Sequence, residues 1–218
     1  MLASDFDYEL ADSAIAQEAI EPRDSARLLI ASTLDDRVFS DLPSLLDPGD
    51  LLVVNETRVR AARLIASKPT GGRVEVLLTK RGDGDIWDAM LRPARRVRSG
   101  TTMTAGPLSI TVLTEPDRGV ATVAVVGDGD TDDHLPAVGR IPLPPYFHGH
   151  LDDDERYQTM FAKTMGSAAA PTAALHFTPR LVADLTARGI DIAAIDLEVG
   201  LDTFRPMDDG PIDGHAGG

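Results

Sequence analysis

The chain contains no cysteine, which excludes disulfides, thiolate zinc sites, iron–sulfur clusters and a thiol nucleophile. This absence fits the reducing conditions of the cytoplasm, where we expect the protein to reside. No apolar run approaches the length that spans a bilayer, and the acidic N-terminus lacks the apolar stretch of a secretory signal. We therefore expect no membrane segment.

Metal-binding and nucleotide-binding motifs are also missing. Neither GxGxxG nor GxxxxGK[ST] occurs, so a nucleotide-type ligand would be held in some other way. The Asp-rich segment 127–133 lacks the residue order and closing Glu of a calcium loop, which predicts a solvated surface loop. No HxxxH spacing occurs among the histidines, which are His134, His148, His150, His176 and His215. We expect no metal site.

Charge is unevenly distributed along the chain. The net charge is −14, yet residues 55–100 contain eleven basic residues against five acidic ones. A basic region on an acidic protein is an electrostatic footprint that a nucleic acid would explain. A set of solvated strand faces explains it equally well at this point.

The 218 residues are 43% apolar and 26% charged, which is typical of a globular protein with one large core or two smaller ones. From about Arg58 to Gly139, short β-runs alternate with turn signals and no helix is evident, which predicts a small antiparallel sheet or barrel. We expect this unit to be inserted in a second domain. The predicted boundaries are 1–57 and 140–218 for the main domain and 58–139 for the insertion.

Outside the insertion, several elements are expected from local patterns. Leu51–Asn55 predicts a buried strand, and 190–200 predicts another. The acidic run at Asp152 predicts the start of a helix that reaches about Lys163. A turn or two of helix is expected near Asp12–Gln17.

The stretch Gly166–Gly189 carries the most information. A run of small residues leads through Pro171 to His176, and Thr178 then predicts a helix N-cap with proline at the first helical position. Gly189 stands where a left-handed C-terminal cap is expected. A ligand can approach the backbone of a small-residue loop closely. A tight turn between two packed elements is the alternative.

Seven ordered motifs resemble a known family. They are FDYEL (6–10), PGDLLVVNETRVRAARL (48–64), TGGRVEVLL (70–78), PLPPY (142–146), ERYQT (155–159), GSAAAPTAALHFT (166–178) and VGLDTFRP (199–206). Together they resemble the S-adenosylmethionine:tRNA ribosyltransferase-isomerases of queuosine biosynthesis. The resemblance implies a mixed α+β fold, with a discontinuous α/β main domain that carries an inserted antiparallel β-barrel domain.

The resemblance also implies the reaction. S-adenosylmethionine would serve as substrate, with no cofactor, and donate its ribosyl group to the 7-aminomethyl-7-deazaguanine base of tRNA. The products would be epoxyqueuosine-tRNA, adenine and methionine. The implied partners are tRNA, bound at its anticodon arm, and S-adenosylmethionine; the implied protein is a monomer.

Candidate residues follow from the matched motifs. The catalytic candidates are His176, for acid–base work or adenine contact, and Thr172. His176 is equally well explained as a buried, hydrogen-bonded side chain that holds the loop. The substrate-binding candidates are Ser167, Pro171, Thr178, Asn55, Arg58 and Arg205. The candidates for tRNA phosphate contacts are Arg92, Arg95, Arg96 and Arg98.

The chain departs from the family in places. Glu198 stands where a histidine is common, and Asp202 and Ala174 stand where glycines are common. Family members also continue well past the FRP motif, so we expect the second part of the main domain to be incomplete. Three hypotheses follow: the enzyme, a catalytically inactive tRNA-binding module, and a divergent paralogue that uses S-adenosylmethionine on another substrate.

Overall fold

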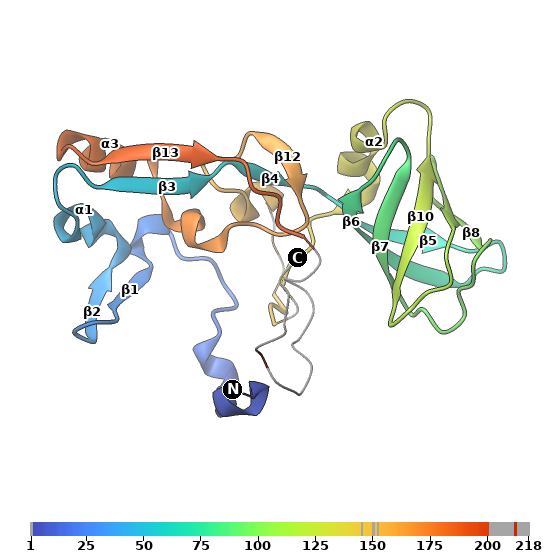
Figure 1. Cartoon of the computed structure of the whole chain (residues 1–218), viewed down its shortest axis with the longest axis horizontal. Helices are drawn as coiled ribbons and strands as arrows, with labels where there is room; N and C mark the ends of the chain where they lie inside the picture. The colour runs from blue at the N-terminus through green and yellow to red at the C-terminus, as the bar shows by residue number, and fades with distance from the viewer. Residues whose placement is uncertain (1, 145, 150, 152, 201–211, 213–218) are drawn as a thin grey trace.

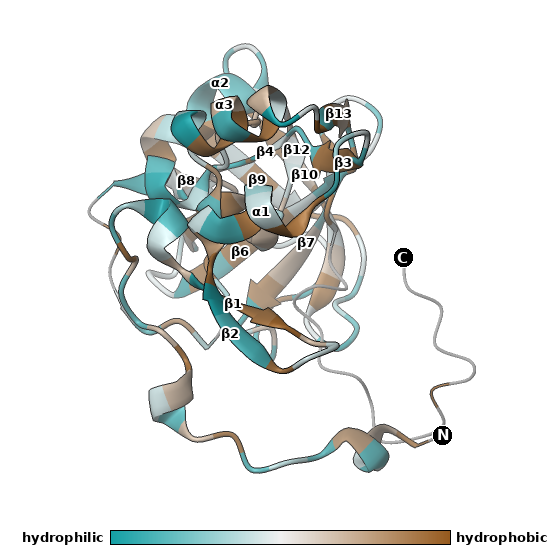
Figure 2. Cartoon of the chain, turned by 90° about the vertical axis from the view of Figure 1, so that its left-hand side faces the viewer, coloured by the Kyte–Doolittle hydropathy of each residue, from teal (hydrophilic) through white to brown (hydrophobic). Residues whose placement is uncertain are grey.

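The computed structural model describes residues 2–144, 146–149, 151, 153–200 and 212 of the chain. Its body has two lobes, a β-barrel and a mixed α/β lobe, and the N-terminal segment runs apart from both (Figures 1 and 2). Two residues of the last motif, Asp202 and Arg205, lie outside the described residues. Their predicted roles stay predictions.

The barrel is an antiparallel sheet that closes on itself. Its strand order is β5-β6-β7-β10-β9-β8, and pairing of Ser67 with Thr104 joins β5 to β8. A short strand, β11, extends the other side of β5. The bounds are β5 (Arg63–Ser67), β6 (Arg73–Arg81), β7 (Ile86–Arg92), β8 (Thr102–Ala105), β9 (Leu108–Val112), β10 (Val120–Val126) and β11 (Gly139–Arg140). The expected inserted antiparallel barrel is confirmed; its exact boundaries at 58 and 139 stay a prediction.

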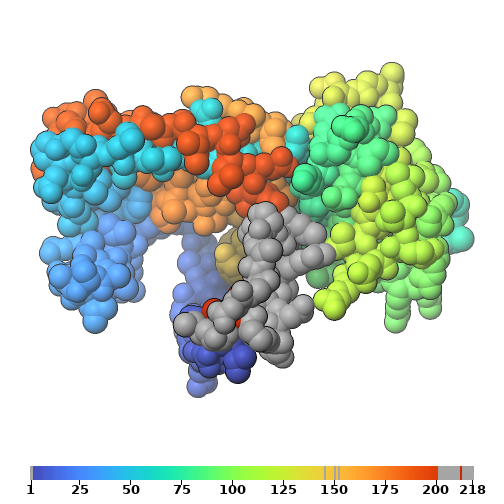
Figure 3. Space-filling view, in the orientation of Figure 1, coloured from blue at the N-terminus to red at the C-terminus, as the bar shows by residue number. Residues whose placement is uncertain are grey.

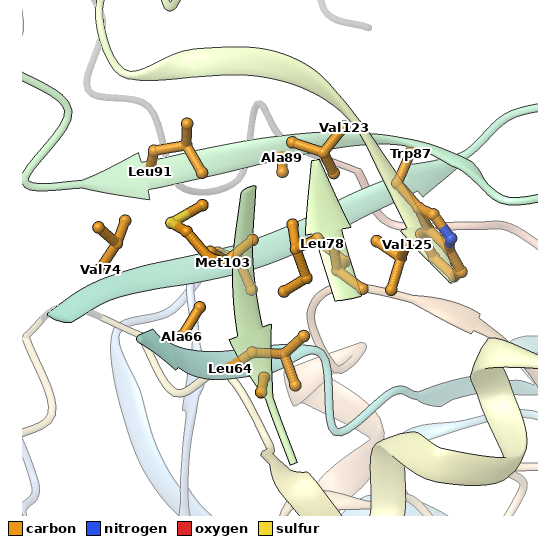
Figure 4. Close-up of a cluster of buried hydrophobic side chains, with 14 of the residues drawn as sticks. Leu64, Ala66, Val74, Leu78, Trp87, Ala89, Leu91, Met103, Val123 and Val125 are labelled. Atoms are coloured by element: carbon orange, nitrogen blue, oxygen red, sulfur yellow. The ribbon is translucent and has the colours of Figure 1, made fainter. Parts of the chain in front are cut away.

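Alternation of side chains explains why these segments form strands. In β7 the buried positions are Trp87, Ala89 and Leu91, with more exposed residues between them. The buried side chains point into the barrel interior, where Leu64, Met103 and Val123 meet them (Figure 4). Each large apolar side chain removed from water contributes about 1.5–3 kcal/mol, so this core is the main support of the barrel.

A helix covers one end of the barrel, contrary to the expectation of a helix-free insertion. Helix α2 (Thr131–Val138) begins where the Asp130 side chain accepts a hydrogen bond from the Asp132 backbone N–H. Leu135 of this helix belongs to the barrel core. The prediction of a solvated loop at 127–133 was therefore wrong from Asp130 onward, because the aspartates cap a helix.

The second lobe pairs strands from both sides of the insertion. β3 (Leu51–Asn55) lies parallel to β13 (Asp191–Ile195), and β4 (Thr57–Val59) lies parallel to β12 (Thr164–Ser167). This pairing confirms a discontinuous α/β domain. Figure 3 shows β3 and β13 side by side along the upper edge of the molecule. β3 was predicted to be buried, but Leu51 and Val53 are exposed.

Helices and a hairpin surround the first of these strand pairs. α1 (Leu42–Leu45) and α3 (Pro179–Ala187) pack with Phe39, Phe177 and Ile190 in one apolar core. β1 (Arg27–Ile30) and β2 (Asp35–Val38) form an antiparallel hairpin. The remaining turns are 3-10 helices: η1 (Ala3–Phe6), η2 (Asp12–Ala14), η3 (Arg23–Ser25), η4 (Phe39–Asp41), η5 (Asp154–Tyr157) and η6 (Thr172–His176).

The start and end of α3 agree with the sequence. The Thr178 hydroxyl accepts a hydrogen bond from the Leu181 N–H at 3.2 Å, and Pro179 is the first helical residue. Gly189 adopts φ +78°, which a glycine at this position allows without a steric penalty. The N-cap and the glycine stop are confirmed.

Three other elements are shorter than expected. The predicted helix to Lys163 ends at Tyr157, because Gln158 leaves helical geometry and its side-chain amide pairs with both backbone groups of Val59, at 3.0 and 2.9 Å. The predicted strand at 190–200 ends at Ile195. Near Asp12 a single 3-10 turn, η2, replaces the expected helix.

An arginine joins the barrel to the second lobe. Arg60 Nε lies 3.0 Å from Asp132 Oδ1 of α2, and the same guanidinium donates to the carbonyl of Gly166. Arg81 shares Asp132, at 3.1 Å, and also pairs with Asp130. The hydrogen bond to Asp130 raises the pKa of Arg81, and the same contact lowers the pKa of Asp130. Only 11% of the Arg60 side chain is exposed, so this link is largely shielded from water.

We expect Arg60→Ala to lower the free energy of unfolding by about 1–3 kcal/mol, because it leaves the partly buried Gly166 carbonyl without this donor and removes one of the two guanidiniums that pair with Asp132. The matched control is Arg73→Ala: Arg73 is exposed and has no ion pair within the described part of the chain. It should change stability by less than about 0.5 kcal/mol. Urea unfolding of both variants measures the difference, and equal effects would show that the link is not stabilising.

Candidate functional site

The parallel pair of β3 and β13 ends where β4 begins. Asn55 and Ile195 are register partners at the carboxyl ends of β3 and β13, and the Glu56 N–H donates to the Ile195 carbonyl at 2.9 Å. In open α/β sheets, ligands bind in the crevice beyond the carboxyl ends of the strands. Three segments meet here: 55–57, 166–170 and 196–200.

Asn55 orients the last of these segments. Its Nδ2 donates to the Leu197 carbonyl at 2.8 Å, and its Oδ1 accepts from the Leu197 N–H at 3.1 Å. The same oxygen accepts from the Thr57 N–H at 3.0 Å. The side chain therefore acts as one more strand partner beyond the end of β13. Contact of Asn55 with substrate stays a prediction.

Ser167 joins all three segments. Its Oγ accepts a hydrogen bond from the Val199 N–H at 2.7 Å and lies 2.8 Å from the hydroxyl of Thr57. The Ala168 N–H donates in turn to the Val199 carbonyl at 2.9 Å. Ser167 and Thr57 are both buried. This geometry supports a structural role for Ser167, and its predicted role in substrate binding is left to experiment.

The small-residue run is itself closely packed. Ala168, Ala169 and Ala170 are buried, and Ala170 belongs to a core cluster with Val59 and Tyr157. Small side chains are needed here because the loop passes close to β4 and η5. The exposed part of the loop begins after Pro171, at Thr172.

Glu198 faces the start of the loop. It is exposed, and a Cβ built on Gly166 would lie 3.9 Å from Glu198 Cγ and 3.6 Å from Thr57 Oγ1. The exposed carboxylate of Glu198 therefore lies where the segments 55–57, 166–170 and 196–200 meet.

Tyr157 lies beneath this loop. Burial raises the pKa of the Tyr157 phenol to about 12, against the opposing effect of a backbone hydrogen bond at Ala170. The phenol is therefore protonated at neutral pH and cannot act as the base of a reaction there.

His176 lies in a different part of the lobe, on an aromatic cluster. Its ring centroid is 5.3 Å from that of Phe39, which in turn lies 5.2 Å from Phe177. The side chain is half-buried. Within the described residues neither ring nitrogen has a hydrogen-bond partner, so the alternative of a hydrogen-bonded structural histidine gains no support.

Arg23 and Asp24 hold η5, η6 and α3 together. Arg23 donates to the carbonyls of Gln158, Glu155 and Leu175 at 2.9, 3.0 and 3.3 Å, and burial lowers its pKa. The buried Asp24 carboxylate accepts from the Thr178 hydroxyl at 3.1 Å and from Arg180 at 2.7 Å. Thr178 thus caps α3 and anchors it, while its predicted contact with substrate is left to experiment. Arg58 is paired with Glu155.

The four candidate tRNA-contacting arginines lie close together in the chain. Arg92 ends β7, and the other three follow in the exposed turn before β8. Arg98 donates to the carbonyl of Val97 at 2.9 Å. Within the described residues none of the four has an ion pair, whereas Arg60 and Arg81 are both paired with aspartates. These four charges are therefore available to an anionic partner.

Sequence reasoning missed the side chains that hold the site: Thr57, Gln158, Arg23 and Arg60. Thr57 and Gln158 lie in the NET and ERYQT motifs, so those motifs are the signal that could have found them. Among the described residues no group of three or more His, Asp or Glu side chains could hold a metal ion. No helix in the same residues is long and apolar enough to cross a membrane.

Comparison with known proteins identifies the family. Residues 3–216 match the family described as "Queuosine biosynthesis protein". A protein from Symbiobacterium thermophilum is 46% identical over 95% of this chain and 63% of its own length. One from Anaeromyxobacter sp. is 45% identical over 99% of this chain and 65% of its own length. Both are named S-adenosylmethionine:tRNA ribosyltransferase-isomerase, and the chain spans less than two thirds of either.

A solved structure with nearly the same name as these relatives is also similar to the chain. The S-adenosylmethionine tRNA ribosyltransferase of Thermotoga maritima is 32% identical to the chain, with a TM-score of 0.35 over 89% of this chain and 58% of that one. The sequence matches, which extend over nearly the whole chain, decide the assignment. The chain belongs to the queuosine biosynthesis protein family.

Proposed function

We propose that the chain transfers and isomerises the ribosyl moiety of S-adenosylmethionine onto the 7-aminomethyl-7-deazaguanine base of tRNA. The products are epoxyqueuosine-tRNA, adenine and methionine. The observation that carries the proposal is the 45–46% identity, over 95–99% of this chain, to proteins whose names contain S-adenosylmethionine and tRNA. Binding at the anticodon arm, a monomeric state and a cytoplasmic location belong to the same proposal.

The chemistry sets what the site must supply. A sulfonium acidifies the protons on the adjoining C5′ carbon and makes the thioether a good leaving group, so a base is needed near that carbon. Water must be kept from the reactive sugar. We assign the base, or the contact with adenine, to His176, whose ring nitrogens have no partner within the described residues. Thr172, exposed at the start of η6, is the neighbouring hydroxyl donor.

The joined strand ends are proposed to hold the donor. Asn55 and Ser167 fix the segment 196–200 beside Gly166, and the exposed Glu198 offers a carboxylate to the sulfonium or to an amine. Pro171 and Thr178 flank the segment that carries His176. Arg58 and Arg205 are proposed for the carboxylate of methionine or a phosphate. The four arginines after β7 are proposed to contact the tRNA backbone.

Activity is tested by incubating the 218-residue chain with S-adenosylmethionine and tRNA that bears the aminomethyl-deazaguanine. We expect adenine release that depends on the modified base, and a decrease of about 10²–10⁴-fold in the His176→Ala variant, because a positioned acid or base contributes that much. Chromatography of free adenine is the measurement.

The control is His148→Ala, since His148 is exposed and its ring has no hydrogen bond within the described residues, while its backbone N–H donates to Gln17 Oε1. An unchanged rate in His176→Ala would remove His176 from the mechanism. A folded sample that releases no adenine contradicts the enzyme. If that sample still binds tRNA in a salt-dependent way, without regard to S-adenosylmethionine, the inactive binding module replaces it.

The arginine turn is tested through salt dependence. The double variant Arg95→Ala/Arg96→Ala should bind tRNA more weakly, and the slope of log K against log salt should shrink by about 1–2, because two phosphate contacts no longer release counterions. Arg188→Ala, on the exposed end of α3 in the other lobe, should leave the slope unchanged. If the unmodified chain, the double variant and Arg188→Ala all gave the same slope, the RNA would not contact the turn that carries Arg95 and Arg96.

A further inference from the structure

Two consecutive residues near the N-terminus hold both flanks of His176. Arg23 and Asp24 lie in η3. Arg23 Nη1 donates to the carbonyl of Leu175, directly before His176, at 3.3 Å and across 152 positions of sequence. The Asp24 carboxylate accepts a hydrogen bond from the hydroxyl of Thr178, two residues after His176, at 3.1 Å. The segment that carries the imidazole is therefore held on each side by a neighbouring residue of the same turn.

The guanidinium of Arg23 has more than this one contact. It also donates to the carbonyls of Gln158 and Glu155, at 2.9 and 3.0 Å. A guanidinium presents its N–H donors in a rigid planar fork, and this one is half-buried. Three acceptors from two segments therefore fix its plane. The position of η6 relative to η5 follows from that plane and not from a single flexible contact.

Asp24 anchors the other flank. Only 2% of its side chain is exposed, and Arg180 Nη2 pairs with the carboxylate at 2.7 Å. A buried carboxylate is costly unless it is paired and hydrogen-bonded, so the contacts with Thr178 and Arg180 are the ones that stabilise it. Thr178 is also the N-cap of α3. The start of that helix and the residues before it are thereby tied to η3.

Little else orients His176. It is the last residue of η6, a 3-10 helix of five residues, and 3-10 hydrogen bonds have poorer geometry than those of an α-helix. Its ring nitrogens have no hydrogen bond within the described residues. The ring packs on Phe39, with 5.3 Å between the centroids. The direction of the imidazole therefore depends on where Arg23 and Asp24 hold the backbone.

We propose that Arg23 and Asp24 are positioning residues, which hold the imidazole of His176 where it meets S-adenosylmethionine. The inference rests on the proposed function, which gives His176 its part in the reaction. Both side chains act through the backbone and the cap on either side of His176, and neither is assigned a contact with substrate. A misplacement of about 1 Å in a reacting group lowers a rate by about 10²-fold, so the pair should matter for kcat more than for substrate binding.

The first test needs no turnover. In protein labelled with ¹³C at histidine Cε1, the NMR line of His176 is assigned by its absence in His176→Gln. The nearby Phe39 ring should displace this line, and Phe39→Leu should remove the displacement. We expect Arg23→Ala and Asp24→Ala to move the line toward its position in the unfolded chain, because the imidazole is no longer held at a fixed place on Phe39.

The second test is kinetic. In the adenine-release assay, Arg23→Ala and Asp24→Ala should lower kcat by about 10–10²-fold. The KM for S-adenosylmethionine should change by less than about 3-fold, since the contacts that hold the donor are intact. If an alanine variant does not fold, Arg23→Lys or Asp24→Asn replaces it. A lysine cannot present a planar fork to three carbonyls, and an asparagine loses the charge that pairs with Arg180, so both should move the NMR line and kcat in the same direction by less.

The matched control is Arg156→Ala. Arg156 holds the same N-terminal segment from the opposite side, since it donates to the Ile20 carbonyl at 3.0 Å and pairs with Glu21 at 3.0 Å. It has no hydrogen bond or ion pair with residues 175–178 in the described part of the chain. Loosening the segment there should leave the His176 line and kcat in place.

The outcomes separate the two proposals. A His176 line that stays in place in both alanine variants, or that Arg156→Ala moves as far, overturns the positioning role whether or not adenine is released. An unchanged kcat in Arg23→Ala and Asp24→Ala, in a chain that His176→Ala inactivates, overturns it as well. A line that moves as expected in a chain that releases no adenine supports the hold on His176 and contradicts the enzyme.

Discussion

The hydroxyl of Ser167 is the contact on which the candidate site depends. It joins residues that are far apart in the sequence, since Thr57 precedes the barrel and Val199 follows α3. Both hydroxyl-bearing side chains are buried, so an unmatched donor or acceptor there would cost about 1–3 kcal/mol. The hydrogen bonds therefore fix the positions of the segments 55–57 and 196–200, which follow β3 and β13. Without them, the segments that follow β3, β12 and β13 would not be held together.

The same loop is also the point where the barrel is attached. Arg60 bonds to Asp132 of α2 on one side and to the Gly166 carbonyl on the other, directly before Ser167. Because the Arg60 side chain is largely shielded from water, its attraction to Asp132 is screened less than that of an exposed ion pair. The geometry of the strand ends and the position of the barrel are thus coupled through neighbouring residues. A proposed RNA surface on one lobe and a proposed donor site on the other share one anchor.

Local patterns predicted the parts of the fold that local physics determines. The short β-runs of the insertion, the Thr178 cap and the Gly189 stop all depend on residues within a few positions of each other. The elements that were predicted wrongly depend on contacts between residues that are distant in the sequence. Gln158 ends a helix because its amide pairs with Val59, which lies 99 positions earlier. Contacts of this kind have no periodicity in the sequence, so no pattern indicates them. For the same reason the sequence pointed to Ser167 but not to what its hydroxyl binds.

An acidic chain can still present a surface suited to RNA. Charges further apart than about 8–10 Å are largely screened at physiological ionic strength, so the local balance matters more than the net charge of −14. Near the barrel, Asp130 and Asp132 are paired with Arg60 and Arg81 and are thereby locally neutralised. The arginines that follow β7 have no such partner in the described chain. The charges of these arginines are therefore not cancelled by a direct ion pair within the described residues, which is a condition that an RNA-binding surface requires.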